Sequence, residues 1–244
     1  MARRDDRGRV TRLALTVKRV AETGSTNVDL LAAALAGNAS EGDWLMAEQQ
    51  SAGRGRHGRL WDSPPGNLHA STLVDLRPAD PPAHLLAFVA AVALAEALPE
   101  PVRLKWPNDV LIDGAKVAGI LLERQGDKVV IGFGVNIASA PALPDRRTTC
   151  LAEHANGLMT ADSVLAALEE RFAADLRTWR GERAVTLARW RTLAHEADEA
   201  LAVALPDGER VEGYYAGIDD AGALRLRLPS GEVRVIHAGD VHLI

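Results

Sequence analysis

A loop rich in glycine and arginine is the segment of this chain best suited to bind phosphate. Residues 51–61 read Ser-Ala-Gly-Arg-Gly-Arg-His-Gly-Arg-Leu-Trp. Glycines let the backbone turn its N–H groups toward an anion, and guanidinium groups bind phosphate oxygens in pairs. Taken alone, the loop fits a phosphate site in an enzyme about as well as a solvated basic loop or a nucleic-acid-binding tract.

A second polar segment, Lys-Trp-Pro-Asn-Asp at residues 105–109, precedes a predicted hairpin that leads to Lys116. Pro107 should end the strand before it and an Asp-Gly turn should reverse the chain, so that Asn108, Asp109 and Lys116 meet at one sheet end. An ammonium there could neutralise a carboxylate that attacks a phosphate. Structural alternatives stay open: Lys116 could protect a strand edge, and Asp109 could hold the Pro107 turn.

The rest of the chain alternates predicted strands and helices that would position these segments. Strands are predicted over residues 13–20, 44–48, 68–76, 102–105, 110–112, 116–123 and 129–137, and helices over 28–36, 83–98, 161–179 and 182–195. The helix over 83–98 is apolar on nearly all sides, which predicts burial against a sheet. From residue 199 onward, five short strands separated by turn signals predict a small SH3-like barrel.

Composition indicates an ordinary globular protein of the cytoplasm. The 244 residues are 47% hydrophobic and 25% charged, enough for one large core and a small module. The single cysteine, Cys150, cannot form an internal disulfide, and no segment has the pattern of a secretory signal. The longest apolar stretch, Leu85–Leu98, contains Glu96 and is shorter than the ~20 residues of a membrane helix. A net charge of −5 argues against a nucleic-acid-binding surface over the whole protein.

Together with two further motifs, these segments resemble the biotin–protein ligase family. The further motifs are Glu-Thr-Gly-Ser-Thr-Asn at 22–27 and Gly-Phe-Gly-Val-Asn at 132–136, and all four occur in the family's order. The Gly-Arg loop paired with Lys-Trp-Pro-Asn-Asp is highly specific, and the resemblance covers nearly the whole chain. It implies an enzyme that uses ATP, with Mg²⁺, to convert biotin into biotinyl-5′-adenylate. The biotinyl group would then pass to a lysine of a biotin carboxyl carrier domain of a carboxylase.

The resemblance also implies the fold and its division. An α/β (α+β) catalytic domain over residues 13–196 would have a mixed, largely antiparallel sheet with flanking helices, similar to class II aminoacyl-tRNA synthetases. An SH3-like domain would follow over 197–244, and residues 1–12 would be loose. About twelve residues before the first strand are too few for the DNA-binding domain of family members that act as repressors. No operator binding is therefore expected. No membrane association is expected either, because the longest apolar stretch is too short, and a homodimer stays open.

The resemblance implies a set of site residues. The biotin-binding set is Ser25, Thr26, Asn27, Gln50, Gly53, Arg54, Gly55, Arg56, Lys116, Gly132 and Gly134. The adenylate-binding set is Arg54, Arg56, Trp61, Asn108, Lys116 and Asn136. The catalytic set is Lys116, Arg56 and Asp109: Lys116 would contact the biotin carboxylate and the phosphate, Arg56 would lie near the phosphate, and Asp109 would orient the acceptor lysine or accept its proton. No protein-held metal site is expected.

Several of these assignments have bland alternatives. Ser25 or Thr26 could simply cap the helix that follows, Gln50 could be a loop amide, and Trp61 could anchor its loop. His57 departs from the family, where another basic residue is common at that position. At the level of function, the alternatives are a lipoate–protein ligase, a non-catalytic biotin- or nucleotide-binding module, and an RNA-binding protein that uses the Gly-Arg loop.

Overall fold

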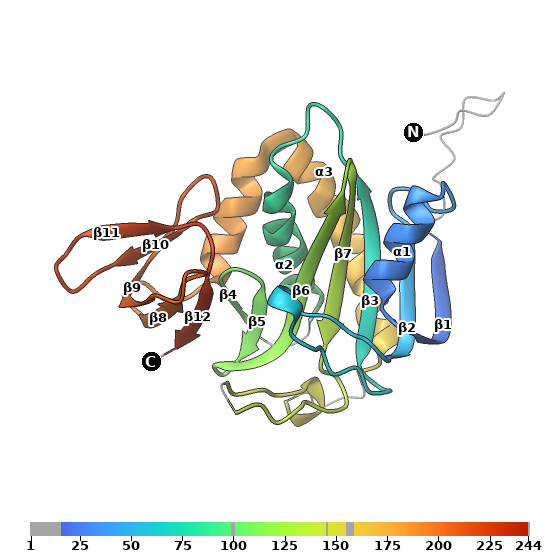
Figure 1. Ribbon diagram of the computed structural model, residues 1–244, viewed down its shortest axis with the longest axis horizontal. Coiled ribbons are helices and arrows are strands. Elements are labelled where there is room, and N and C mark those ends of the chain that lie inside the picture. Colours follow the sequence, from blue (N-terminus) through green and yellow to red (C-terminus); the bar gives the residue numbers. More distant parts are fainter. Residues whose placement is uncertain (1–15, 99–100, 145, 155–158, 244) are drawn as a thin grey trace.

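The structure, a computed structural model, describes residues 16–98, 101–144, 146–154 and 159–243. Its described part consists of a seven-stranded sheet with helices on both faces and a five-stranded sheet at one side (Figure 1). The predicted loose segment 1–12 lies outside the described residues. Among the described residues, no helix is both long enough and apolar enough to cross a membrane.

The large sheet is mixed and largely antiparallel, as predicted. Its strands are β1 (Val17–Thr23), β2 (Trp44–Gln50), β3 (Leu68–Asp75), β4 (Arg103–Lys105), β5 (Asp109–Ile112), β6 (Ala115–Gln125) and β7 (Lys128–Val135). Their order across the sheet is β1-β2-β3-β7-β6-β5-β4. Strands β1 and β2 are parallel, and the other neighbours are antiparallel. Strand β6, which carries Lys116, is therefore an inner strand, and the edge-protecting interpretation of this lysine is wrong.

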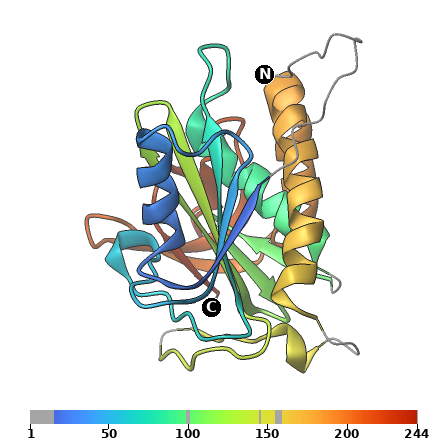
Figure 2. The ribbon, with the colours of Figure 1, turned by 90° about the vertical axis from the view of Figure 1, so that its right-hand side faces the viewer.

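Helices cover both faces of this sheet. Helix α1 (Thr26–Leu35) lies on one face, and α2 (Leu86–Ala97) and α3 (Ala161–Leu193) lie on the other (Figure 2). Because successive strand side chains point to opposite faces, Val130 packs toward α1 while its neighbours Val129 and Ile131 belong to the larger core. Most of α2 is buried, which confirms the prediction from its all-round apolar surface.

The two helices predicted over 161–179 and 182–195 correspond to two helical segments joined by a kink, which together form α3. Helix α3 begins with a capping box between Thr160 and Ser163 and runs to Leu193. Glu182, with φ −138° and ψ 68°, interrupts it locally without ending it. The sequence thus located the break between the two helical segments, and α3 packs against α2.

The C-terminal sheet has the five predicted strands. These are β8 (Ala200–Ala204), β9 (Arg210–Ile218), β10 (Leu224–Arg227), β11 (Val233–Ile236) and β12 (Asp240–Leu243), in the antiparallel order β11-β10-β9-β8-β12. This pairing is consistent with an SH3-like fold. The sheet shares one hydrophobic core with the large unit, and Trp106 Nε1 donates to the Gly222 carbonyl at 3.0 Å. The predicted division into domains at residue 196 stays a prediction.

The ends of three elements differ from prediction near the N-terminus. Strand β1 continues to Thr23 rather than ending at residue 20, and the predicted residues 13–15 lie outside the described part. Helix α1 begins at Thr26, two residues before the predicted start, which places Ser25 at its N-cap. Strand β2 extends to Gln50, so this residue is a strand end and not a loop amide. Pairing between β1 and β2 extends both strands beyond their apolar pattern.

Candidate active site

A single pocket of about 550 Å³ brings the four sequence motifs together. It lies between the Gly-Arg loop, the turn before α1, the inner strands of the large sheet and the beginning of β12. Every residue of the predicted site lines it: Ser25, Thr26, Asn27, Gln50, Gly53, Arg54, Gly55, Arg56, Trp61, Asn108, Asp109, Lys116, Gly132, Gly134 and Asn136. The structure therefore assembles the predicted residues, while their individual roles stay predictions.

One end of the pocket is a network of neutral polar groups around Gln50. The Gln50 Oε1 atom accepts from the Thr26 backbone N–H at 2.8 Å and from its hydroxyl at 3.1 Å. Gln50 Nε2 donates to the Ser63 hydroxyl at 2.9 Å. The parallel β1–β2 pair ends with Thr23 opposite Gln50, which places the start of α1 beside the end of β2. This end can offer hydrogen bonds to an uncharged polar group.

Asn27 is held rigidly at the same end. Its Nδ2 donates to Glu123 Oε2 at 2.9 Å and to the Leu121 carbonyl at 3.2 Å, and its Oδ1 accepts from the Ser71 hydroxyl at 2.6 Å. Gly132 of β7 lies directly against this amide, and a Cβ at this position would overlap Asn27 Oδ1. Glycine at 132 thus makes room for the Asn27 side chain.

Ser25 occupies the N-cap position of α1 without using its side chain as a cap. Its backbone is extended, with φ −159° and ψ 125°, and its hydroxyl makes no capping hydrogen bond. Only 6% of the residue is exposed, and it lines the pocket. The capping interpretation therefore does not account for the serine side chain here.

The other end of the pocket carries a buried charge cluster. Asp109 Oδ1 lies 2.5 Å from Lys116 Nζ, and Asp109 Oδ2 lies 3.1 Å from Lys105 Nζ. Burial by itself would raise the pKa of Asp109, but the two ammonium groups outweigh it and lower the pKa to about 2. Burial lowers the pKa of Lys116, and Asp109 opposes that shift. The Asp109 carboxylate thus binds two lysines instead of the Pro107 turn.

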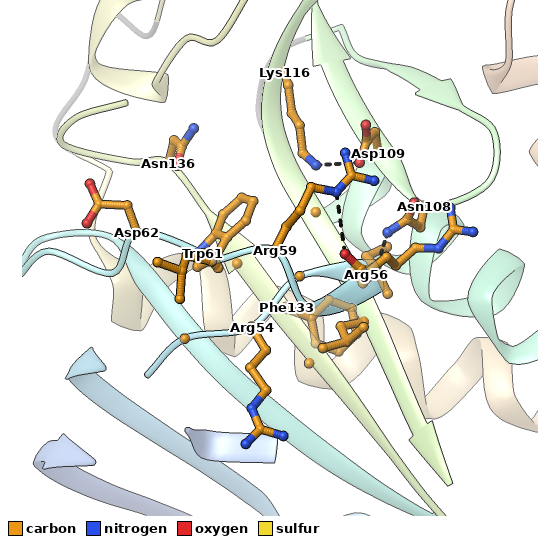
Figure 3. A pocket seen from close by; sticks show the side chains of 18 of the residues that line it. Arg54, Arg56, Arg59, Trp61, Asp62, Asn108, Asp109, Lys116, Phe133 and Asn136 are labelled. Carbon is orange, nitrogen blue, oxygen red and sulfur yellow. Dashed lines mark hydrogen bonds and ion pairs between the residues drawn. The ribbon is translucent and has the colours of Figure 1, made fainter. Parts of the chain in front are cut away.

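The Lys116 side chain is only 14% exposed. Its Nζ also lies 5.4 Å from the centre of the Trp61 ring. Figure 3 shows its ammonium directed at Asp109.

The arginines of the Gly-Arg loop point in different directions. Arg56 lies in a short 3₁₀ turn (Arg56–Gly58), and its Nη1 lies 3.4 Å from Asn108 Oδ1 and 3.3 Å from the Gly239 carbonyl. Burial lowers the pKa of the Arg56 guanidinium. Arg54 is directed away from this cluster, 4.0 Å from Glu123 (Figure 3). Arg56 and Arg59, not Arg54, are therefore the loop arginines on the side of Lys116 and Asp109.

Trp61 lies against two glycines of neighbouring strands. A Cβ on Gly134 would overlap the indole ring, and a Cβ on Gly119 would lie 3.1 Å from it. Among the described residues, the buried indole N–H has no hydrogen-bond partner. The indole N–H is therefore available to a hydrogen-bond acceptor.

The two asparagines predicted near the nucleotide brace the backbone. Asn108 Nδ2 donates to the Ile120 carbonyl at 2.7 Å, and Asn136 Nδ2 donates to the Thr149 carbonyl at 3.2 Å. His57 has a left-handed backbone, with φ 57°, and its exposed side chain does not line the pocket.

Several pocket residues were not predicted. Lys105 and Arg59 belong to motifs that were recognised, so their position in those motifs was a usable signal. Asp240 lies far away in the sequence at the start of β12, and its ion pairs with Arg56 and Arg59 have no local signature. Across residues 16–98, 101–144, 146–154 and 159–243, no group of three His, Cys, Asp or Glu residues could hold a metal ion.

Two protein families match different parts of the chain. Residues 23–136 match the Biotin/lipoate A/B protein ligase family, and residues 202–243 match the Biotin protein ligase C terminal domain. In structure the chain is similar to the biotin protein ligase from Aquifex aeolicus in complex with biotin and ATP. The TM-score is 0.82 at 26% identity, with 94% of this chain and 98% of that chain covered.

Curated relatives extend over the same length. The biotin–[acetyl-CoA-carboxylase] ligase of Paracoccus denitrificans is 40% identical to this chain, and the match covers 91% of this chain and 98% of that protein. The corresponding ligase of Mycobacterium tuberculosis is 36% identical, over 91% of this chain and 86% of that protein. The bifunctional ligase/repressor BirA of Escherichia coli is 35% identical, with 68% of its length covered. With identities of this size over nearly the full length of two ligases, the chain belongs to the biotin protein ligase family.

Proposed function

We propose that this protein uses ATP to activate biotin as biotinyl-5′-adenylate and then transfers the biotinyl group to a lysine of a biotin carboxyl carrier domain. The observation that carries the proposal is one pocket with a neutral hydrogen-bonding end and a cationic end. The names of the relatives point to acetyl-CoA carboxylase as the source of the acceptor domain. The cytoplasm, where ATP and the carboxylase are available, is the proposed compartment.

The neutral end fits the ureido ring of biotin. That ring presents one carbonyl acceptor and two N–H donors, which are matched by hydroxyl and amide groups rather than by charges. Ser25, Thr26, Asn27 and Gln50 supply such groups on a framework fixed by hydrogen bonds. A preformed set of partners limits the entropy that the site loses when the ligand binds.

The cationic end fits the reacting carboxylate and the α-phosphate. A carboxylate oxygen of biotin attacks the α-phosphorus, a new P–O bond forms, and pyrophosphate leaves with the electrons of the broken P–O bond. Two anions must approach one another, so positive charge and fixed positions lower the barrier. Lys116 and Arg56 stand on opposite sides of Asp109 and Asn108 and supply that charge. Trp61, with its unpaired N–H, is assigned to the adenylate.

In the second step the acceptor lysine attacks the acyl carbon. The new C–N bond replaces the C–O bond to AMP, which leaves with the electron pair, and the amine loses a proton to solvent. Asp109 is a poor acceptor for that proton at neutral pH because its pKa is about 2. We therefore assign Asp109 to holding Lys105 and Lys116, and we do not assign it to the role of general base.

Mg²⁺ is proposed to enter with ATP. Phosphate oxygens and water supply most ligands of this ion at nucleotide sites. Asp109, the buried carboxylate at the cationic end, is already paired with two lysines, so an all-protein cage does not fit here. Bound to ATP, the ion would supply additional charge neutralisation on the phosphates.

The test is an assay of both half-reactions. Purified protein is incubated with ATP, Mg²⁺ and either biotin or lipoate, and pyrophosphate release is measured. Biotin transfer is then followed to a carrier domain, with a variant of that domain whose acceptor lysine is arginine as the control. Biotin-dependent release and labelling of the lysine-containing domain alone are expected. Turnover with lipoate only, or biotin binding without pyrophosphate release, would overturn the proposal.

A further inference from the structure

The C-terminal sheet places a carboxylate at the mouth of the pocket, opposite two arginines of the Gly-Arg loop. Asp240 is the first residue of β12. One of its oxygens contacts Arg59 Nη2, and the other lies 3.6 Å from Arg56 Nη1. The two loop residues lie more than 180 positions earlier in the chain, so the contact joins segments that are far apart in the sequence.

We propose that Asp240 is a positioning residue for adenylate formation: it ties the Gly-Arg loop to the C-terminal sheet through Arg59 and so keeps Arg56 over the pocket. The proposal rests on the proposed function for its kinetic consequences. The effect of this contact on the Gly-Arg loop can be tested without substrates.

The backbone on which Asp240 stands is fixed from two sides. Asp240 pairs with Ala204 of β8, and the preceding Gly239 packs so closely that a Cβ there would lie 2.8 Å from the Val203 side chain. On the other side, Lys105 Nζ donates to the Val241 carbonyl at 3.0 Å. The carboxylate is therefore presented from a rigid strand next to the buried charge cluster.

Arg59 is the residue through which the tie acts. Its Nη2 contacts Asp240 while its Nε lies 3.4 Å from the Arg56 carbonyl, so one side chain joins β12 to the 3₁₀ turn of the loop. Arg56 approaches Asp240 at more than hydrogen-bond length, and its Nη1 makes long hydrogen bonds to Asn108 Oδ1 and to the Gly239 carbonyl. Arg59 is thus anchored by the short contact, whereas Arg56 is oriented by long contacts that a phosphate could replace.

The two roles of the carboxylate have opposite effects on ATP binding. As a competing anion, Asp240 would weaken the attraction of Arg56 for phosphate. As an anchor, it holds the loop in place before ATP binds and so reduces the conformational entropy that the loop loses on binding. The short contact is with Arg59 and the long one is with Arg56, so anchoring should dominate. Loss of the carboxylate should therefore weaken ATP binding much more than biotin binding.

The kinetic experiment compares Asp240→Asn, Arg59→Gln, the double variant and Asp240→Glu by pyrophosphate release, with ATP and biotin varied in turn. Each single variant should raise KM for ATP roughly tenfold, the size expected from one charge-assisted hydrogen bond. The double variant should be no worse than the poorer single variant, and Asp240→Glu should recover most of the loss. Glu209→Gln, which removes an exposed ion pair with Arg234 in the same sheet, is the matched control and should behave as wild type.

A second measurement uses no substrate. Trypsin should cut after Arg54 and Arg56 several-fold faster in Asp240→Asn than in wild type or Glu209→Gln, because the loop opens more often. Three outcomes would each overturn the proposed role of Asp240. They are additive effects of the two single variants, a rise in KM for biotin equal to that for ATP, and unchanged cleavage together with unchanged KM. If wild type releases no pyrophosphate but the cleavage rates differ as expected, the proposed function fails and the tie stands.

Discussion

The Lys116 ammonium meets the Asp109 carboxylate although the two residues are not partners in the sheet register. Asp109 pairs with Gly119 of β6, and Lys116 pairs with Leu111 of β5, with a register shift between Val110 and Leu111. The lysine side chain reaches Asp109 by passing over Gly119, where a Cβ would lie 3.1 Å from its Nζ. A shift in register and a missing side chain together build the cationic end of the pocket.

Replacement of Lys116 should separate catalysis from folding. Lys116→Met keeps most of the side-chain volume and removes the charge, so pyrophosphate release should fall at least about a hundredfold. Asp109 keeps Lys105 as a partner, so the free energy of unfolding should drop by less than the about 3–5 kcal/mol that a buried charge left without any partner costs. Pyrophosphate assays and urea unfolding measure the two effects. A folded variant with near-normal pyrophosphate release would remove Lys116 from the proposed mechanism.

A methyl group at position 132 should damage the biotin end selectively. In Gly132→Ala the new Cβ overlaps the Asn27 amide, which must leave its bonds to Ser71 and Glu123. KM for biotin should rise on the order of tenfold or more, with a smaller change in KM for ATP. Gly181→Ala in α3, where a Cβ meets open space, is the control and should keep both constants. Equal rises in both KM values would argue against a local biotin site.

Removal of the Ser25 hydroxyl should affect the ligand and not the helix. Because this hydroxyl makes no capping bond, Ser25→Ala should lower the free energy of unfolding by less than about 0.5 kcal/mol. KM for biotin should still rise, since the hydroxyl is assigned to the ureido ring. Thermal unfolding and steady-state kinetics check the two parts. A large loss of stability with unchanged KM would restore the capping interpretation.

Stability should decline as the pH falls below the ordinary range of histidine because of His195. Burial lowers the pKa of this imidazole from 6.5 even though Glu199 lies 2.8 Å from its Nδ1, and Lys105 and Arg103 add to the lowering. The folded state then binds fewer protons than the unfolded state. The stabilisation is present above pH 6.5 and is lost as the pH falls through the lower folded pKa.

Urea unfolding at about pH 7.5 and about pH 5.5 measures this effect. His195→Gln should reduce the decline, and the remainder should come from His69 and His242, because burial lowers the pKa of these two histidines as well. The same pH dependence in wild type and His195→Gln would show that other groups cause it.

Features that depend on residues close together in the chain could be predicted, whereas features that depend on contacts between distant segments could not. Periodicity and turn residues lie within short segments, so they predicted the strands and helices, including the five C-terminal strands. The motifs are short as well, and all the site residues that they predicted line one pocket. Element ends were less predictable. Gln50 extends β2 through its pairing with β1, which no pattern within β2 reveals.

The amino-acid sequence by itself determined which chemical groups are available: a glycine-rich loop with three arginines, two lysines near an aspartate and a set of neutral amides and hydroxyls. Only the tertiary structure decided how they are used. It turned Arg54 away from the cationic end, bound Asp109 between two lysines, and brought Asp240 across the molecule to Arg59. These outcomes depend on packing and charge pairing between segments far apart in the chain, and such contacts leave no signature in the local order of residues.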